Sequence, residues 1–141
     1  MVTGNLKLFK ACGTLLLANN TKRLLFLLRD NDTHSNTWGL VGGKVEDSET
    51  VMQALTREIK EEIGLDDLKV VQGPLIRINK PNNYFCQLYR SSSDKSIAEF
   101  NLQKEEVEQL KWFDFDVLKK EYQKQPDNFV PIISKILDLI I

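Results

Sequence analysis

The sequence predicts one mixed α/β domain over residues 1–141. Short apolar runs of strand length alternate with turn-forming residues, and one longer segment has the apolar period of a helix. The composition, 42% hydrophobic and 28% charged, is that of an ordinary globular domain. A chain of this length buries roughly 68% of its unfolded surface on folding, so we expect a core that needs neither disulfides nor a structural metal.

Two strands joined by a tight turn are predicted first. Leu6–Ala18 alternates loosely between apolar and polar residues, and Arg23–Arg29 is an apolar run with charged ends. Residues 19–22, Asn-Asn-Thr-Lys, have turn composition. We expect the polar stretch Asp30–Thr37 to be a surface loop, and the two glycines at 42 and 43 to interrupt the chain after the next apolar group.

A helix is predicted from Ser48 to Gly64. Apolar residues recur there at helical spacing, namely Val51, Met52, Leu55, Ile59 and Ile63. Ser48 is a candidate N-cap because a short hydroxyl side chain can accept a hydrogen bond from a free helix N–H. Gly64 is expected to end the helix, since glycine adopts the left-handed conformation of a helix stop without strain.

The second half of the chain predicts more strands and two further helices. The predicted strands are Leu68–Ile78, Tyr84–Arg90 and Val107–Phe113, with a polar loop at Ser91–Ser96. A short helix is predicted at Asp116–Lys124. The apolar residues after Pro131 fall at i, i+3, i+4 and i+7, namely Ile133, Ile136, Leu137 and Ile140. This spacing predicts a C-terminal helix that packs on the domain.

Charge and cysteine content narrow the classes of function. The chain carries 19 basic and 20 acidic residues, a formal net charge of −1, which argues against general nucleic-acid binding. No signal peptide or membrane span is recognisable, so we expect a cytoplasmic protein with no membrane partner. Cys12 and Cys86 lie in separate predicted strands and are expected to be buried, reduced thiols. The oligomeric state is left open.

Three glutamates share one face of the predicted helix. Glu58, Glu61 and Glu62 stand at i, i+3 and i+4. Like charges at this spacing repel one another, and the last turn of a helix disfavours anions because of the helix dipole. A divalent cation such as Mg²⁺ or Mn²⁺ prefers hard oxygen ligands and would remove this repulsion. The alternative is a solvated acidic face that Arg57 and Lys60 partly neutralise.

The residues around this face follow a specific spacing. Gly43 is followed by five residues and Glu49, and then by seven residues and the run Arg-Glu-Ile-Lys-Glu-Glu-Ile-Gly-Leu at 57–65. This pattern resembles the box of the Nudix hydrolase family, whose fixed positions are all met from Gly43 to Leu65. The lead-in at 38–43 is also similar, although Val41 stands where a proline is usual. The resemblance implies an α/β/α sandwich with a mixed β-sheet between helices.

The resemblance also implies a metal site and its chemistry. Mg²⁺, with Mn²⁺ as the alternative ion, would be held by the Gly42 carbonyl and by four glutamates, Glu58, Glu61, Glu62 and Glu106. Glu105 is the rival of Glu106. Arg57 would fix a carboxylate by a charge-assisted hydrogen bond. Glu58 is the first candidate for the general base and Glu106 the second, while Glu49 would orient the loop or act as a first-turn helix charge.

The implied substrate is a nucleotide or another nucleoside diphosphate derivative. Candidate substrate contacts are Arg29 for phosphate oxygens and Trp38, Tyr84 and Asn128 for the base. A MutT-like nucleoside triphosphate pyrophosphohydrolase, releasing a nucleoside monophosphate and pyrophosphate, is the first hypothesis. Hydrolysis of ADP-ribose, dinucleoside polyphosphates or capped RNA is the alternative within the family. A non-catalytic nucleotide sensor is the alternative from another class, although every glutamate of the box is present.

Overall fold

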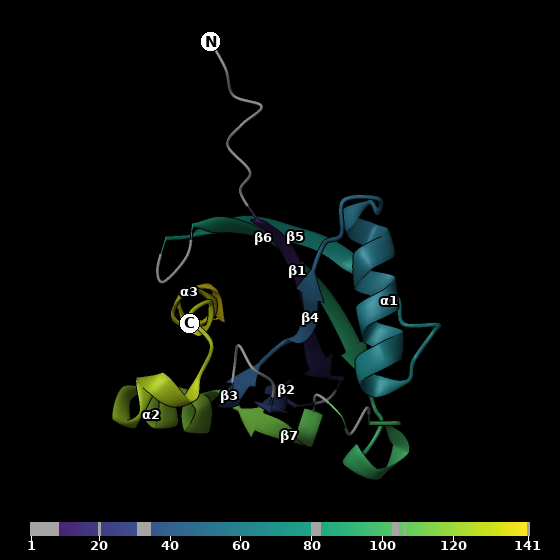
Figure 1. Ribbon diagram of the computed structural model, residues 1–141. Helices are drawn as coiled ribbons and strands as arrows, with labels where there is room; N and C mark the ends of the chain where they lie inside the picture. The colour runs from purple at the N-terminus through teal and green to yellow at the C-terminus, as the bar shows by residue number, and fades with distance from the viewer. Residues whose placement is uncertain are drawn as a thin grey trace.

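A mixed β-sheet lies between helices in the computed structural model, which describes residues 9–19, 21–30, 35–79, 83–102, 105 and 107–140 (Figure 1). The strands are β1 Phe9–Ala18, β2 Arg23–Asp30, β3 Ser35–Gly39, β4 Val41–Lys44, β5 Val71–Ile78, β6 Tyr84–Ser93 and β7 Val107–Asp114. The α-helices are α1 Val51–Ile63, α2 Phe115–Lys124 and α3 Ile133–Ile140, and the short 3-10 helices are η1 Ile97–Glu99 and η2 Pro126–Asn128. The predicted sandwich is confirmed.

The described strands form one sheet of mixed direction. Its order is β3-β2-β1-β6-β5, and in addition β4 pairs with β1 and β7 pairs with β2. The pairing of β1 with β6 is parallel over its whole length, whereas the other pairs are antiparallel. On its other edge β1 pairs with β4 through residues 11–14 and with β2 near Leu17. This shared edge brings the end of β2 and the start of β4 to the same side of α1.

Each face of the sheet carries its own hydrophobic core. The core under α1 includes Leu55, Ile59 and Ile63 of that helix, packed against strand residues such as Leu25 and Leu27. The core on the opposite face packs α2 and α3 against Leu24, Phe26 and Leu88, among other strand residues. Successive strand residues point to opposite faces, which is why Leu24 and Leu25 belong to different cores. Helix α1 therefore lies on one face, and α2 and α3 lie on the other (Figure 1).

Helix α1 begins later than the sequence predicted. Its N-cap is Thr50 and not Ser48, because the Thr50 hydroxyl accepts from the Gln53 N–H while the Gln53 side chain accepts from the Thr50 N–H. Only a residue three positions before Gln53 can form this reciprocal pair. The predicted end is confirmed, since Gly64 caps the helix at φ 74° and donates its N–H to the Lys60 carbonyl.

Two predicted loops are partly strand. Residues 35–37 belong to β3, where Thr37 pairs with Arg29 and Ser35 with Asp30. The polar composition of this stretch suits a strand at the edge of the sheet. Ser91–Ser93 likewise extends β6, because it pairs with β1 up to the register Ala18 opposite Ser93. Composition alone does not reveal either pairing: β3 pairs with the preceding strand β2 although its residues are polar, and β6 pairs with β1, which lies far away in the sequence.

The two glycines at 42 and 43 do not interrupt the chain. Both lie inside β4, with Gly42 opposite Gly13 and Gly43 opposite Cys12. Gly42 has φ 153°, and a Cβ there would collide with the Cys12 carbonyl oxygen. The glycines therefore permit a close approach of β4 to β1, rather than a turn.

The remaining predicted elements are confirmed with small shifts at their ends, while residues 6–8 of the first predicted strand and residues 31–34 of the first predicted loop lie outside the described residues. The strand predicted from Leu68 begins at Val71, and Asp114 caps α2 by accepting from the Asp116 N–H.

Cys12 and Cys86 are buried and free. They point to opposite faces of the sheet, because Cys86 pairs with Ala11 and not with Cys12. No helix among the described residues is long and apolar enough to cross a membrane.

Candidate active site

Glu62 is a buried carboxylate in the last turn of α1. Its side chain is 1% exposed, and both of its oxygens are hydrogen-bonded. The Gly42 N–H donates to Oε1 at 2.8 Å, and the Arg29 Nη1 donates to Oε2 at 2.7 Å. Burial raises the pKa of Glu62 to about 7, an effect that the positive charge and hydrogen bond of Arg29 oppose. Glu62 is therefore a carboxylate held inside the protein and not part of a solvated acidic surface.

Arg29 connects the end of β2 to the chain around β4. Its Nη2 donates to the Leu40 carbonyl at 2.7 Å and to the Gly42 carbonyl at 3.0 Å. With the bond to Glu62, the guanidinium binds three acceptors at once, which its planar fork of donors allows. The Arg29 side chain is only 12% exposed. The residue predicted to bind substrate phosphate thus contacts two of the predicted metal ligands, Gly42 and Glu62.

Glu58 lies one turn earlier on α1, directly against β4. A Cβ on Gly43 would lie 2.8 Å from the Glu58 carboxylate carbon, so only glycine leaves this carboxylate in place. The Glu58 side chain is 14% exposed. Burial raises its pKa, and Arg57 opposes the shift through a hydrogen bond and its charge. A carboxyl with this environment accepts a proton more readily than an exposed glutamate does.

Arg57 holds the loop before α1 to the helix. It donates to both carboxylate oxygens of Glu49, at 2.7 and 2.9 Å, and to Glu58 at 2.8 Å. This pairing lowers the pKa of Glu49 to about 2. A weaker contact of 3.4 Å reaches Glu61, whose side chain is 50% exposed. Glu49 precedes the helix, so its contacts favour a role in orienting the loop over that of a first-turn helix charge.

The donor set of this site suits a hard divalent cation. Gly42 offers a carbonyl oxygen, Glu62 offers a buried carboxylate, Glu58 a partly buried one, and Glu61 an exposed one. The guanidinium of Arg29 stands between Gly42 and Glu62 as a resident cation. In the described part of the chain, no three carboxylates are already gathered closely enough to hold an ion. Glu106 lies outside the described residues, and its rival Glu105 is exposed.

A comparison with protein families identifies this arrangement. A family model described as NUDIX domain matches residues 7–133, which is most of the chain. The chain belongs to the Nudix family. The Nudix box therefore runs from Gly43 in β4 through the whole of α1 to Leu65, and the contacts of Arg57, Glu58 and Glu62 lie within it or at its edge.

Known Nudix proteins resemble the chain over different lengths. The m7GpppN-mRNA hydrolase of Saccharomyces cerevisiae is 27% identical over 130 residues, covering 90% of this chain and 13% of that protein. The dihydroneopterin triphosphate diphosphatase of Escherichia coli is 45% identical over 51 residues, covering 36% of this chain and 33% of that protein. A MutT Nudix hydrolase structure from Burkholderia pseudomallei aligns with TM-score 0.65 and 25% identity, covering 77% of this chain and 84% of that one. The chain thus spans a third or less of the curated relatives it matches.

The predicted base contacts lie away from the Nudix helix. Trp38 belongs to the core opposite α1, and its ring packs edge-on against Phe113 with centroids 5.1 Å apart. Asn128 is exposed in η2, and the next residue, Phe129, forms a bridge with Trp38. The structure thus brings Trp38 and Asn128 to one edge of the sheet. Tyr84 is half-buried at the start of β6 in the same core and is separate from them.

Gly39 lies between the edge of the sheet that carries Trp38 and Asn128 and the side that carries Arg29. A Cβ on Gly39 would lie 3.3 Å from both the Arg29 Nε and the methyl groups of Val130, which follows η2 by two residues. Thr37 faces the same side as Arg29, because the two residues pair across β2 and β3. Its hydroxyl is buried without a hydrogen-bond partner in the part of the chain that is described. Sequence reasoning did not identify Thr37, Gly39 or the carbonyl of Leu40 as site residues.

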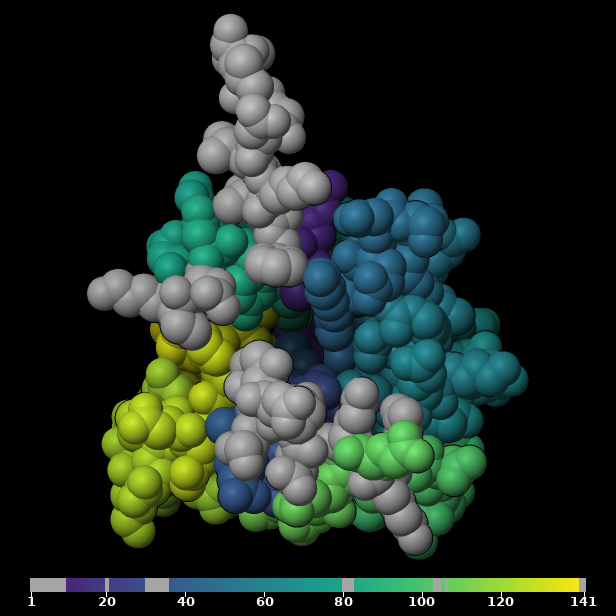
Figure 2. All heavy atoms as spheres, viewed as in Figure 1, coloured from purple at the N-terminus to yellow at the C-terminus, as the bar shows by residue number. Residues whose placement is uncertain are grey.

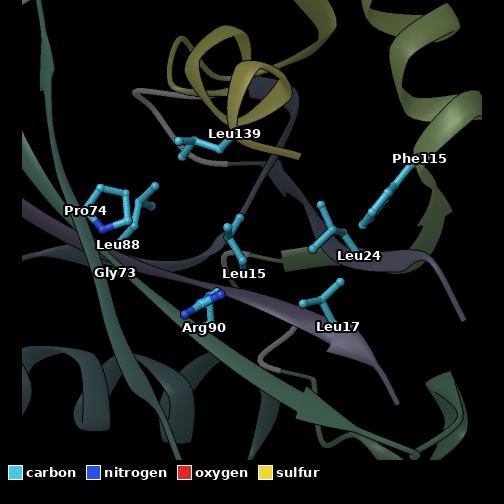
Figure 3. A pocket seen from close by; sticks show the side chains of 9 residues that line it. All are labelled: Leu15, Leu17, Leu24, Gly73, Pro74, Leu88, Arg90, Phe115 and Leu139. Atoms are coloured by element: carbon cyan, nitrogen blue, oxygen red, sulfur yellow. The ribbon is translucent and has the colours of Figure 1, made fainter. Parts of the chain in front are cut away.

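The space-filling view shows a hollow beside α1. Figure 2 shows that this face of the molecule is hollowed along one side of α1. Atoms of the first strands, coloured purple to dark blue, form the floor of the hollow. A separate apolar recess of about 370 Å³ lies beside α3 on the opposite face of the sheet (Figure 3). Its described lining includes Leu15, Leu88, Phe115 and Leu139 with Arg90 as the one charged residue. That recess lacks the carboxylates of the Nudix box.

Proposed function

We propose that the chain is a Mg²⁺-dependent Nudix hydrolase that cleaves the diphosphate linkage of nucleoside diphosphate derivatives. The observation that carries this proposal is the set of oxygen donors where α1 meets β4, which combines Glu58, Glu62 and the Gly42 carbonyl. Helices with a solvated acidic face do not bury their carboxylates in this way. Buried carboxylates of raised pKa are typical of functional sites.

Each residue of the site has a proposed role as a metal ligand, as the general base or in positioning the base. We propose that Glu58, Glu61, Glu62, Glu106 and the Gly42 carbonyl hold the ion. When bound, a divalent cation neutralises phosphate oxygens and lowers the pKa of a water molecule. Glu58 is the proposed general base, with Glu106 as the second candidate, and would take the proton of the attacking water on a carboxylate oxygen. Arg57 keeps Glu58 in place through its short hydrogen bond.

The substrate class we propose is a nucleoside triphosphate, cleaved to a nucleoside monophosphate and pyrophosphate. The similarity to the dihydroneopterin triphosphate diphosphatase supports this choice, because that name gives a triphosphate as the substrate, and the similarity to a MutT hydrolase agrees with it. Trp38 and Asn128 would bind the base at the edge of β3. Arg29 is the proposed phosphate contact. The product would leave as two separate anions.

Capped RNA is a second candidate for the substrate. The yeast m7GpppN-mRNA hydrolase supports it, since that similarity extends over 90% of this chain. The net charge of −1 argues against it, because RNA backbones are bound mainly by basic residues. ADP-ribose and dinucleoside polyphosphates remain the other in-family substrates to compare, and a non-catalytic nucleotide sensor is the alternative outside catalysis.

A substrate panel with product analysis tests the proposal. Purified protein with Mg²⁺ is incubated with nucleoside triphosphates including oxidised dGTP, with ADP-ribose, with dinucleoside polyphosphates and with a capped RNA fragment, and each reaction is repeated in EDTA. Release of monophosphate and pyrophosphate from a triphosphate, only with Mg²⁺, is the expected result. Preferential cleavage of capped RNA would replace the substrate class. Saturable nucleotide binding without turnover would support the sensor instead.

A further inference from the structure

We infer that Arg29 holds two of the oxygen ligands proposed for the divalent cation, the Gly42 carbonyl and the Glu62 carboxylate, and gives them up when the cation binds. The inference rests on the proposed function, because it takes Gly42 and Glu62 as metal ligands. It goes further by assigning Arg29 a role as a competitor of the ion. Arg29 is thus part of the switch between the metal-free and the metal-bound site.

The acceptors of Arg29 are the basis of this inference. Its guanidinium lies 2.7 Å from the Glu62 carboxylate and 3.0 Å from the Gly42 carbonyl. Both atoms are oxygen donors of the kind that a hard divalent cation binds. The third acceptor, the Leu40 carbonyl at 2.7 Å, is not a proposed ligand. Arg29 can therefore keep this third contact as an anchor while it gives up the other two.

Two cations on these acceptors would repel each other. The Glu62 side chain is 1% exposed and that of Arg29 is 12% exposed, so water screens their charges poorly. A divalent ion placed on Glu62 and Gly42 would lie next to the guanidinium in this buried region and repel it. The metal-free protein, in turn, needs a cation beside Glu62, because a buried carboxylate without a partner is costly. Binding of the ion to these two acceptors therefore opposes their contacts with Arg29.

Competition has a measurable consequence for metal affinity. If the ion binds only to molecules in which Arg29 is displaced, its apparent dissociation constant equals the intrinsic one divided by the fraction of such molecules. Removing the guanidinium removes this factor. A residue that merely supports the metal ligands would have the opposite effect, because its loss would loosen Glu62 and weaken metal binding.

The first experiment measures Mn²⁺ affinity by calorimetry at pH 8. We expect Arg29→Met to lower the dissociation constant about tenfold relative to the wild type. Arg23→Met is the matched control, because it removes one positive charge from the other end of the same strand and its exposed guanidinium bonds only locally to Thr21 in the described contacts. We expect that control to stay within about twofold of the wild type. Unchanged or weaker binding in Arg29→Met overturns the inference.

The second experiment follows Arg29 in the wild-type protein, so that it does not depend on the folding of a variant. The guanidinium N–H signals of Arg29 are observed by ¹H–¹⁵N NMR and are assigned by their loss in Arg29→Lys. Hydrogen bonds to Glu62 and Gly42 slow the exchange of these protons with water in the metal-free protein. We expect Mg²⁺ to shift these signals and speed their exchange. Signals that Mg²⁺ leaves unchanged overturn the inference.

The two experiments separate failure of the inference from failure of the proposed function. If the wild type binds Mn²⁺ and Arg29→Met binds it no more tightly, the proposed metal site stands and the competition by Arg29 is refuted. If neither protein binds Mn²⁺, the metal site itself is refuted and the inference falls with it. Tighter binding in Arg29→Met, together with Mg²⁺-dependent changes in the Arg29 signals, supports both.

Discussion

Arg29 and Glu62 are 33 residues apart in the sequence, yet the guanidinium of one lies 2.7 Å from the carboxylate of the other. The first residue lies near the end of β2 and the second in the last turn of α1. Their ion pair joins the sheet to the Nudix helix beneath the acidic face. A buried pair of this kind makes the site part of the folded core, so changes to it affect stability as well as chemistry.

Replacing the buried glutamate should therefore destabilise the metal-free protein. Glu62→Gln leaves the Arg29 guanidinium without its carboxylate, and we expect a loss of about 3 kcal/mol in the free energy of unfolding. Urea unfolding in EDTA at pH 8, above the raised pKa of Glu62, measures this loss. Glu61→Gln is the matched control, because the Glu61 side chain is 50% exposed, and it should change the unfolding free energy by less than about 0.5 kcal/mol. Equal effects of the two variants would contradict the burial of Glu62.

A methyl group on Gly43 should disturb the site without unfolding the protein. The added Cβ would lie 2.8 Å from the carboxylate carbon of Glu58, and the flexible glutamate side chain would move away to relieve the contact. We expect Gly43→Ala to lower the hydrolysis rate on the order of 100-fold, with a nearly unchanged melting temperature. Gly13→Ala in the neighbouring strand is the control, because its Cβ would make only ordinary contacts of 3.5 Å. Full activity in Gly43→Ala would show that the position of Glu58 is unimportant.

The pairing of Glu49 with Arg57 should appear as a pH dependence of stability. The hydrogen bond from Arg57 lowers the pKa of Glu49 from 4.5 to about 2. A carboxyl whose pKa is lower in the folded state contributes stability above its unfolded pKa and loses it as the pH falls through the folded pKa. The stability difference between wild type and Glu49→Gln should thus be constant above about pH 5 and shrink toward pH 2. Thermal unfolding across this range measures it, and a constant difference down to pH 2 would contradict the pairing.

Both cysteines should be unreactive in the folded protein. Burial raises the pKa of Cys12 to about 11 and that of Cys86 to about 12, so almost no thiolate is present at pH 8. We expect a thiol reagent such as Ellman's reagent to label neither cysteine in native buffer and both in urea. Labelling of one cysteine before unfolding would show that its strand opens locally.

The sequence predicts those parts of the fold that depend on local pattern. Helix α1 follows from its apolar period, and α3 follows from the spacing of its isoleucines and leucine after Pro131. The predicted N-cap was wrong because two candidate hydroxyls stand two residues apart, and only Thr50 is followed by a glutamine three positions later. The glycines of β4 were misinterpreted because their pairing with β1 joins segments far apart in the sequence. Residues 35–37 of β3 were misinterpreted because they are polar, although they pair with the preceding strand β2.

The candidate site was predictable in composition and not in arrangement. The spacing of Glu58, Glu61 and Glu62 identified the acidic face, and the Nudix box gave their context. Helical periodicity could not tell that Glu62 is buried while Glu61 is half-exposed, because burial depends on where β2 and β4 lie. The contact of Arg29 with Gly42 and Glu62 joins three separate elements, and no local pattern encodes it.

The central claim is that the glutamates of α1 form a metal-dependent site of diphosphate hydrolysis. The most direct test measures pyrophosphate release from a nucleoside triphosphate by wild type and Glu61→Gln over a range of Mg²⁺ concentrations. We predict a wild-type rate that saturates with Mg²⁺ and disappears in EDTA, and a rate lower on the order of 100-fold in the equally stable variant. Equal rates in the two proteins, or a wild-type rate that EDTA leaves unchanged, would contradict the claim.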